Sequence, residues 1–252
     1  MSNQTRLGMI TPSLNTVLEP VTYALLADLP DVTAHFSRVR VSQISLGEDS
    51  AAQFGDEPML AAARMLADAR VHAICWNGTA GSWLGPDFDR RLCEAIARET
   101  GIPATSATLA LAELFRSRGV KRFALVTPFE DALQAAIVDT YRREGFECVA
   151  ERHLDSDDTF GYASIPSATT EGMIREVVGA EPEAIAAVCT NLNGAPHAQA
   201  LEAEYGRPVY DSVAAALWGT LALAGADPSR IAGWGEIFSV APASLERLGA
   251  LA

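Results

Sequence analysis

The chain has 252 residues, of which 49% are hydrophobic and 20% charged, and its formal net charge at pH 7 is -13. This length allows a sizeable core in one domain or in two half-size lobes. The acidic balance argues against nucleic acid and membrane surfaces as partners, because both bind clustered Lys and Arg. No apolar run is long enough to span a membrane and residues 1–11 do not read as a signal peptide, so we expect a cytoplasmic protein with reduced thiols.

Short apolar segments alternate with amphipathic stretches of about ten to fifteen residues. The segments predicted to be strands are Leu7–Ile10, Thr33–Val41, Val71–Trp76, Ala104–Thr105, Arg122–Val126, Glu147–Glu151, Ala184–Cys189 and Val209–Tyr210. Strands that alternate with helices in this way are typical of parallel sheets built from βαβ units. The sequence therefore predicts an α/β fold of mainly parallel sheets flanked by helices.

Three pairs of similar segments recur in the same order along the chain. They are RLGMITP at 6–12 with RFALVTP at 122–128, the strand that reaches Cys75 with the strand that reaches Cys189, and Gly-Ile-Pro at 101–103 with Gly-Arg-Pro at 206–208. This repeat predicts two similar lobes related by a pseudo-twofold axis. We expect a first lobe at 1–118, a second at 119–215, and a C-terminal segment at 216–252 that packs back on the first lobe.

The candidate site follows from where parallel sheets bind ligands, which is beyond the carboxyl ends of their strands. Cys75 and Cys189 each stand at a predicted strand end, before a turn that contains Asn and Gly. Nearby backbone N–H groups favour the thiolate in such a position. If a pseudo-twofold axis relates the lobes, the two thiols face each other and can act on one substrate from opposite sides. Cys93 and Cys148 are interpreted as packing residues.

Other chemistries have little support in the sequence. No Gly-x-Gly-x-x-Gly or phosphate-binding loop follows a predicted strand, and the histidines are scattered, so we expect no cofactor and no metal. His197 follows the second turn and either tunes Cys189 or is a solvated histidine at a helix start. The segment 155–166 is long enough to be a lid. A non-catalytic solute-binding protein with two lobes stays open as an alternative.

The two cysteine turns resemble those of the aspartate/glutamate racemase superfamily over nearly the whole chain. Within it, Thr11–Glu19 and Leu125–Pro128 are similar to the corresponding segments of maleate cis-trans isomerases, and arylmalonate decarboxylases are similar in length and layout. The resemblance implies a cofactor-independent isomerase of a small carboxylate, most directly maleate to fumarate. Amino-acid or hydantoin racemisation and arylmalonate-type decarboxylation are the alternatives. Symmetry favours a homodimer or homotetramer.

The resemblance also implies roles for individual residues. Cys75 would be the nucleophile that adds to an alkene carbon, and Cys189 would be its partner acid or base. The substrate-binding residues would be Asn15, Asn77, Thr79, Phe129, Asp158, Thr190 and Asn191. Decarboxylases of the family carry only the second cysteine and have glycine in place of the first, so Cys75 favours an isomerase or racemase.

Two positions depart from the maleate isomerase pattern. Phe129 stands where those enzymes have tyrosine, which removes a hydroxyl group, and Asp158 stands where they have asparagine. A carboxylate that faces a dicarboxylate is repulsive unless it is protonated or turned away. A substrate with an amine or a neutral group would therefore suit Asp158 better than maleate.

Overall fold

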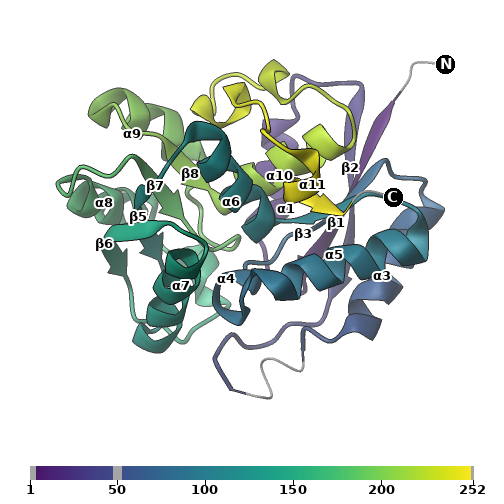
Figure 1. Ribbon diagram of the computed structural model, residues 1–252, viewed down its shortest axis with the longest axis horizontal. Coiled ribbons are helices and arrows are strands. Elements are labelled where there is room, and N and C mark those ends of the chain that lie inside the picture. The colour runs from purple at the N-terminus through teal and green to yellow at the C-terminus, as the bar shows by residue number, and fades with distance from the viewer. Residues whose placement is uncertain (1–3, 48–52, 251–252) are drawn as a thin grey trace.

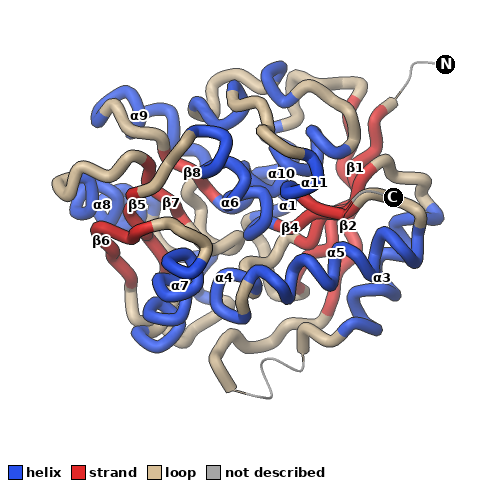
Figure 2. The backbone as a smooth tube through the Cα atoms, in the orientation of Figure 1, coloured by secondary structure: helices blue, strands red, loops and turns tan. Residues whose placement is uncertain are grey.

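The computed structural model describes residues 4–47 and 53–250, so residues 1–3, 48–52 and 251–252 of the expected lobe ranges lie outside the described residues. Two sheets form two lobes (Figures 1 and 2). The first has the strand order β2-β1-β3-β4-β9 and the second the order β6-β5-β7-β8. All neighbouring strands are parallel except β4 and β9. The predicted α/β fold of mainly parallel sheets flanked by helices is confirmed.

The first sheet and its helices are built almost entirely from the first half of the chain. The elements are β1 (Thr5–Pro12), α1 (Leu18–Leu25), β2 (Val32–Val39), α3 (Asp56–Asp68), β3 (Ala73–Trp76), α4 (Gly81–Leu84), α5 (Pro86–Thr100), β4 (Ala104–Ser106) and α6 (Ala107–Arg118). Ser106 caps the start of helix α6, where its hydroxyl accepts the N–H of Leu109, and Gly119, whose φ of 68° is left-handed, caps its end. These caps are the serine start and glycine stop that such a helix prefers.

The second sheet repeats this arrangement. Its elements are β5 (Arg122–Thr127), α7 (Asp131–Arg143), β6 (Glu147–His153), η1 (Gly161–Ser164), α8 (Ser167–Val178), β7 (Ala184–Ala187), η2 (Ala195–His197), α9 (Ala198–Tyr205), β8 (Val209–Asp211) and α10 (Ser212–Leu223). The chain then continues through η3 (Pro228–Arg230), η4 (Glu236–Ser239), α11 (Leu245–Leu248) and β9 (Gly249–Ala250). The C-terminal elements, yellow in Figure 1, lie beside the first sheet, where β9 pairs with β4.

All eight predicted strands are present, but two of them end two residues earlier than expected: β2 ends at Val39 and not at Val41, and β7 also stops early. The sequence predicts that β7 reaches Cys189, whereas it ends at Ala187. The backbone N–H of Val188 still donates to the carbonyl of Val126, at 2.9 Å, and the chain then turns away. Cys189 therefore lies on a turn beyond the strand.

One helix from each half of the chain packs against the other half. Phe115 of α6 packs against aromatic rings of the second half, with ring centroids 5.1 Å from Phe123 and 6.1 Å from Tyr210. Helix α10, which follows the second sheet, packs in return on β3, β4 and α6. The expected boundary at 215/216 falls inside α10, because the return to the first lobe already begins with this helix.

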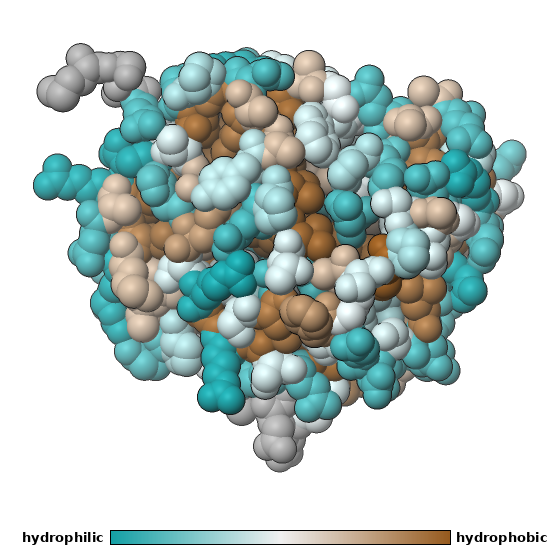
Figure 3. Space-filling model, turned by 180° about the vertical axis from the view of Figure 1, so that it is seen from behind, coloured by the Kyte–Doolittle hydropathy of each residue, from teal (hydrophilic) through white to brown (hydrophobic). Residues whose placement is uncertain are grey.

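A continuous apolar core runs through both lobes, and a smaller cluster lies between the second sheet and α8 and α9. On the face opposite to that of Figure 1, apolar side chains gather toward the middle and hydrophilic ones surround them (Figure 3). Within the described ranges, no helix is long and apolar enough to cross a lipid bilayer.

Candidate active site

The sheet register shows which residues of the two lobes are equivalent. Strand β1 pairs with β3 so that Ile10 lies opposite Trp76, and β5 pairs with β7 so that Val126 lies opposite Ala187. Ile10 and Val126 hold the same place in the repeated RLGMITP and RFALVTP segments. Trp76 is therefore equivalent to Ala187.

Two residues further along, Gly78 is equivalent to Cys189. The hydrogen bonds beyond the strands agree, because Asn77 N–H donates to the Ile10 carbonyl at 2.9 Å just as Val188 N–H donates to the Val126 carbonyl. Cys75 is not the equivalent of Cys189, because it sits three residues too early. The similar sequences around the two cysteines suggested that they are equivalent, whereas the pairing of the strands shows that they are not.

Cys75 does not face Cys189. It lies inside β3, where successive side chains point to opposite faces of the sheet, and Trp76 next to it lines the cavity described below. The Cys75 thiol hydrogen-bonds with the side chain of Thr220 on α10, and its burial raises its pKa to about 12. The expected pair of opposed thiols is therefore not formed.

A cavity of about 30 Å³ lies between the carboxyl ends of the two sheets. Five of the predicted site residues line it, namely Asn15, Thr79, Cys189, Thr190 and Asn191. Much of the remaining wall is apolar and includes the rings of Phe54, Trp76 and Trp83. These aromatic wall residues were not predicted as binding residues. Gly78 also lines the cavity, and a Cβ atom there would lie 2.1 Å from the Trp76 ring, so the turn needs glycine.

Polar side chains join the two lobes across this cavity. The Asn15 amide donates to the Thr190 hydroxyl at 3.1 Å, and that hydroxyl donates to the Asn77 carbonyl at 2.9 Å. The Asn191 side-chain oxygen accepts the N–H of Thr16 at 3.1 Å. Asn15 is fixed in turn, because its side-chain oxygen accepts two N–H groups at the start of α1. The two repeated turns therefore form one polar wall.

Three predicted substrate-binding residues do not line the cavity. The Asn77 side chain is buried and donates to the Met9 sulfur and to the Cys75 carbonyl. Phe129 is buried behind Trp83, with ring centroids 5.5 Å apart. Asp158 is exposed, and its carboxylate accepts the N–H of Gly161 at 3.0 Å at the start of η1. The repulsion expected between Asp158 and a dicarboxylate does not arise, because its carboxylate caps this turn.

Thr159, next to Asp158, connects the lobes instead. Its hydroxyl accepts the N–H of Ile44, at 3.3 Å, and its carbonyl accepts the side-chain N–H of Asn191, also at 3.3 Å. Thr159 is buried, and one of its partners comes from each lobe. Sequence reasoning did not single out this residue. That the segment 155–166 opens and closes as a lid stays a prediction.

Cys189 is buried, and this decides its ionisation. Burial raises the pKa of the thiol to about 12; the backbone N–H groups of Asn191 and Leu192 act to lower it, and the charge of Asp211 adds to the increase. We expected the N–H groups to favour the thiolate, but the loss of solvation outweighs them. The resting group is a neutral thiol, which suits it to donate a proton.

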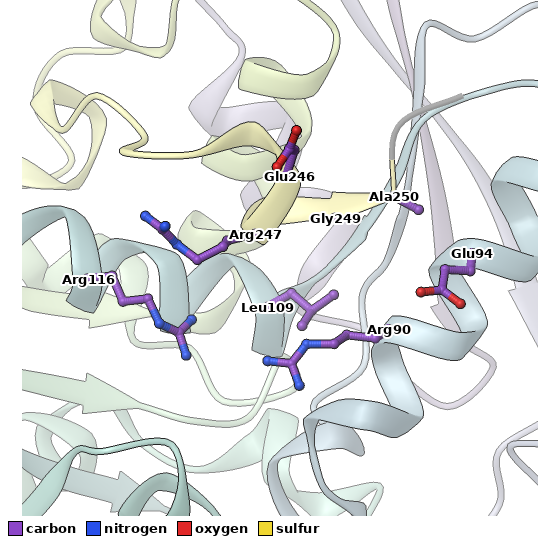
Figure 4. Close-up of a pocket in the computed structure, with 8 residues that line it drawn as sticks. All are labelled: Arg90, Glu94, Leu109, Arg116, Glu246, Arg247, Gly249 and Ala250. Carbon is purple, nitrogen blue, oxygen red and sulfur yellow. The ribbon is translucent and has the colours of Figure 1, made fainter.

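A larger cavity, of about 260 Å³, shares no lining residue with this site. Figure 4 shows the residues that line it. Arg90, Arg116 and Arg247 line it, together with residues of α11 and β9. Their charges are already paired, because Arg90 and Arg116 both contact Glu144 and Arg247 contacts the buried Glu113. None of the predicted site residues reaches it. Among the residues that the structure describes, no cluster of His, Cys, Asp or Glu is placed to hold a metal ion.

Comparison with known proteins agrees with this architecture. The maleate isomerase of Pseudomonas putida is 29% identical over 88% of this chain and 92% of its own length. The arylmalonate decarboxylase of Bordetella bronchiseptica is 25% identical over 92% of this chain and 95% of its own. The solved structure of a cysteine-to-alanine variant of a Pseudomonas putida maleate isomerase, with maleate, is 26% identical, covers 95% of this chain and 99% of that chain, and has a TM-score of 0.85.

A double variant of arylmalonate decarboxylase, in which a glycine is replaced by cysteine and a cysteine by serine, shares the fold with a TM-score of 0.82 and 24% identity, over 93% of this chain and 99% of that chain. The family model described as arylmalonate decarboxylase matches residues 14–238, which is most of the sequence. This chain belongs to the arylmalonate decarboxylase family.

Proposed function

We propose that this protein is a cofactor-independent isomerase that converts maleate to fumarate, with Cys189 as the reacting thiol. The observation that carries the proposal is the position of Cys189 on a small cavity whose polar wall, including Asn15, Thr79 and Thr190, comes from both lobes. The hydrogen-bonding groups on the cavity wall come from both lobes, which suits a small substrate that carries a carboxylate at each end. The similarity to maleate isomerases supports the same substrate.

A single thiol is enough for this reaction. The Cys189 thiol passes its proton to a substrate carboxylate and its sulfur bonds to one alkene carbon, while the electron pair of the double bond moves onto the other carbon and its carboxylate. The bond between the two carbons is then single and rotates. Departure of the sulfur re-forms the double bond in the trans geometry, and the sulfur takes its proton back from that carboxylate. The neutral side chains of Thr79 and Asn191 are proposed to hold the carboxylates.

Decarboxylation of a malonate is the second candidate, and Gly78 is the observation that favours it. The residue equivalent to Cys189 is glycine, which is the pattern that the resemblance implies for the decarboxylases. In that reaction the bond between the α-carbon and one carboxylate breaks, carbon dioxide leaves, and the electron pair of the bond moves onto the α-carbon and the remaining carboxylate. The neutral Cys189 thiol then donates its proton to the α-carbon. A racemase needs an acid or base on each face, and Cys75 does not supply the second.

Proton NMR in D2O separates these functions. The enzyme is incubated with maleate, and in parallel with phenylmalonate and methylmalonate, beside the variants Cys189→Ala and Cys75→Ala. A fumarate signal that requires Cys189 supports the isomerase. A monocarboxylate with deuterium at the α-carbon supports the decarboxylase instead and overturns the isomerase. If no substrate reacts, neither enzyme proposal stands, and maleate binding without turnover would support the solute-binding alternative.

We further propose that the working form is a homodimer or homotetramer and that the protein acts in the cytoplasm. Closed twofold symmetry is the commonest arrangement among soluble enzymes, and the four cysteines are free thiols, as a reducing compartment requires. Sedimentation that shows only monomer would refute the first statement, and cell fractionation tests the second.

A further inference from the structure

Asp211 is a buried carboxyl group at the junction of β8 and α10, and its side chain is 1% exposed. Its Oδ1 accepts the N–H groups of Val213 and Ala214, at 2.7 and 3.2 Å, and so caps α10. In the first half of the chain, Ser106 stands in the same place and caps α6 with a hydroxyl. Capping alone therefore does not require a charged group, and a buried carboxylate is costly to keep without a further role.

The second oxygen of Asp211 points at the turn that carries Cys189. This oxygen, Oδ2, is buried and faces the backbone of Gly194 and Ala195 without a well-formed hydrogen bond. A Cβ atom on Gly194 would lie 2.8 Å from Oδ2, so the turn approaches the carboxyl as closely as glycine allows. The turn itself is tightened by a hydrogen bond from Leu192 N–H to the Cys189 carbonyl at 3.0 Å.

The other titratable groups around Cys189 do not bring a charge to it. Tyr162 of η1 interacts with the thiol, but its hydroxyl is neutral and donates to the Ser156 carbonyl at 2.9 Å. His197 of η2 is engaged with Glu171 of α8, at 3.1 Å. Asp211 is the charged group that acts on the thiol. Its pKa is raised to about 7 by burial, against backbone hydrogen bonds that lower it, so its charge changes near neutral pH.

We propose that the charge of Asp211 adjusts how tightly the buried Cys189 thiol holds its proton. An ionised Asp211 keeps the sulfur as a thiol that can donate a proton, because a second negative charge beside it is unfavourable. A protonated Asp211 removes that repulsion and lets the thiolate form more readily. The inference rests on the proposed function only in that Cys189 is the reacting thiol, and Asp211 acts through Cys189 as a positioning residue.

The test is an infrared titration of the Cys189 S–H stretch in the full-length protein without substrate. The band is assigned as the one lost in Cys189→Ser. In the wild type we expect it to shift as the pH passes through about 7, the pKa of Asp211. In Asp211→Asn, which keeps the cap on α10, the shift should be absent. Asp89→Asn is the matched control, since Asp89 is equally buried and acts on Cys75.

A Cys189 band that does not respond to pH in the wild type overturns the proposal, and so does an unchanged response in Asp211→Asn. The wild-type titration decides the matter even if that variant fails to fold. Because no turnover is measured, a positive result stands whatever the substrate proves to be. If turnover is found, the pH at which it changes should move in Asp211→Asn and stay in place in Asp89→Asn.

Discussion

Cys189 and Cys75 have the same chemistry but different surroundings, and only Cys189 lines the cavity between the lobes. We expect Cys189→Ala to lower turnover by roughly a hundred- to ten-thousand-fold, since it removes the acid or nucleophile. We expect Cys75→Ala to keep most of the turnover and to lose about 1 kcal/mol of stability from the small void beside Thr220. Steady-state kinetics and urea unfolding of both variants check this.

A folded Cys75→Ala protein without activity would show that the buried thiol takes part in the reaction. Serine at position 75 offers a second check, because its hydroxyl can keep a hydrogen bond to Thr220 but cannot act as a thiol.

Asp89 gives a prediction for the pH dependence of stability. It is fully buried, and this raises its pKa to about 7, although hydrogen bonds from Ser106 and Thr108 act to lower it. In the unfolded chain the pKa is about 3.9. The folded state therefore holds the proton more tightly, so Asp89 lowers stability progressively as the pH rises from about 4 to 7, and no further above that.

We expect Asp89→Asn to be more stable than the wild type at pH 8, relative to pH 5, by on the order of a few kcal/mol. Urea unfolding at the two pH values measures the difference. The same change of stability with pH in both proteins would mean that Asp89 does not titrate in this range.

The residue scale also shows how far sequence reasoning reaches. The turns that carry Asn15, Thr190 and Asn191 could be placed at one edge because turns after parallel strands meet there, and these three residues line the cavity. That they bind substrate stays a prediction. Cys75 could not be excluded from the site in this way, since the sequence around it matches the sequence around Cys189. By strand register the equivalent of Cys189 is Gly78, three residues further along. Register depends on backbone hydrogen bonds between strands distant in sequence, which similarity within the chain does not reveal.

At the scale of elements, Thr159 connects the segment between β6 and η1 to both lobes through hydrogen bonds with Ile44 and Asn191. We expect Thr159→Val to leave the Ile44 N–H without its acceptor, to cost about 1 kcal/mol, and to speed hydrogen exchange at Ile44. Thr100→Val is the matched control, since the Thr100 hydroxyl also accepts a backbone N–H, that of Ile102, but lies away from the cavity. Equal hydrogen exchange at the Ile44 amide in the wild type, Thr159→Val and Thr100→Val would show that the Thr159 hydrogen bond does not hold this segment in place.

The elements themselves were largely predictable. Apolar runs such as Arg122–Val126 give the strands, and glycine stops such as Gly119 end the helices. The short strand β9 was not predicted, because two residues carry no pattern and its pairing with β4 depends on the tertiary fold. The early end of β7 at Ala187 has the same origin.

At the scale of the whole molecule, α6 and α10 cross between the lobes and make the two sheets depend on each other. Phe115 of α6 is fully buried among rings of the second half, including Phe123 and Phe146 at 5.1 Å. Helix α6 also packs on α10, which covers the first sheet. Loss of the Phe115 ring should therefore weaken both lobes.

We expect Phe115→Ala to cost about 3–5 kcal/mol and to speed hydrogen exchange in β1 and β3 as well as in β5 and β7. Ile174→Ala is the comparison, because Ile174 of α8 belongs to the smaller apolar cluster, whose members all come from the second half of the chain. Its exchange effect should stay in the second sheet. If β1 and β3 stayed protected from exchange in Phe115→Ala, the lobes would unfold independently, and their joint cavity would depend on the polar contacts made by Asn15, Asn191 and Thr159.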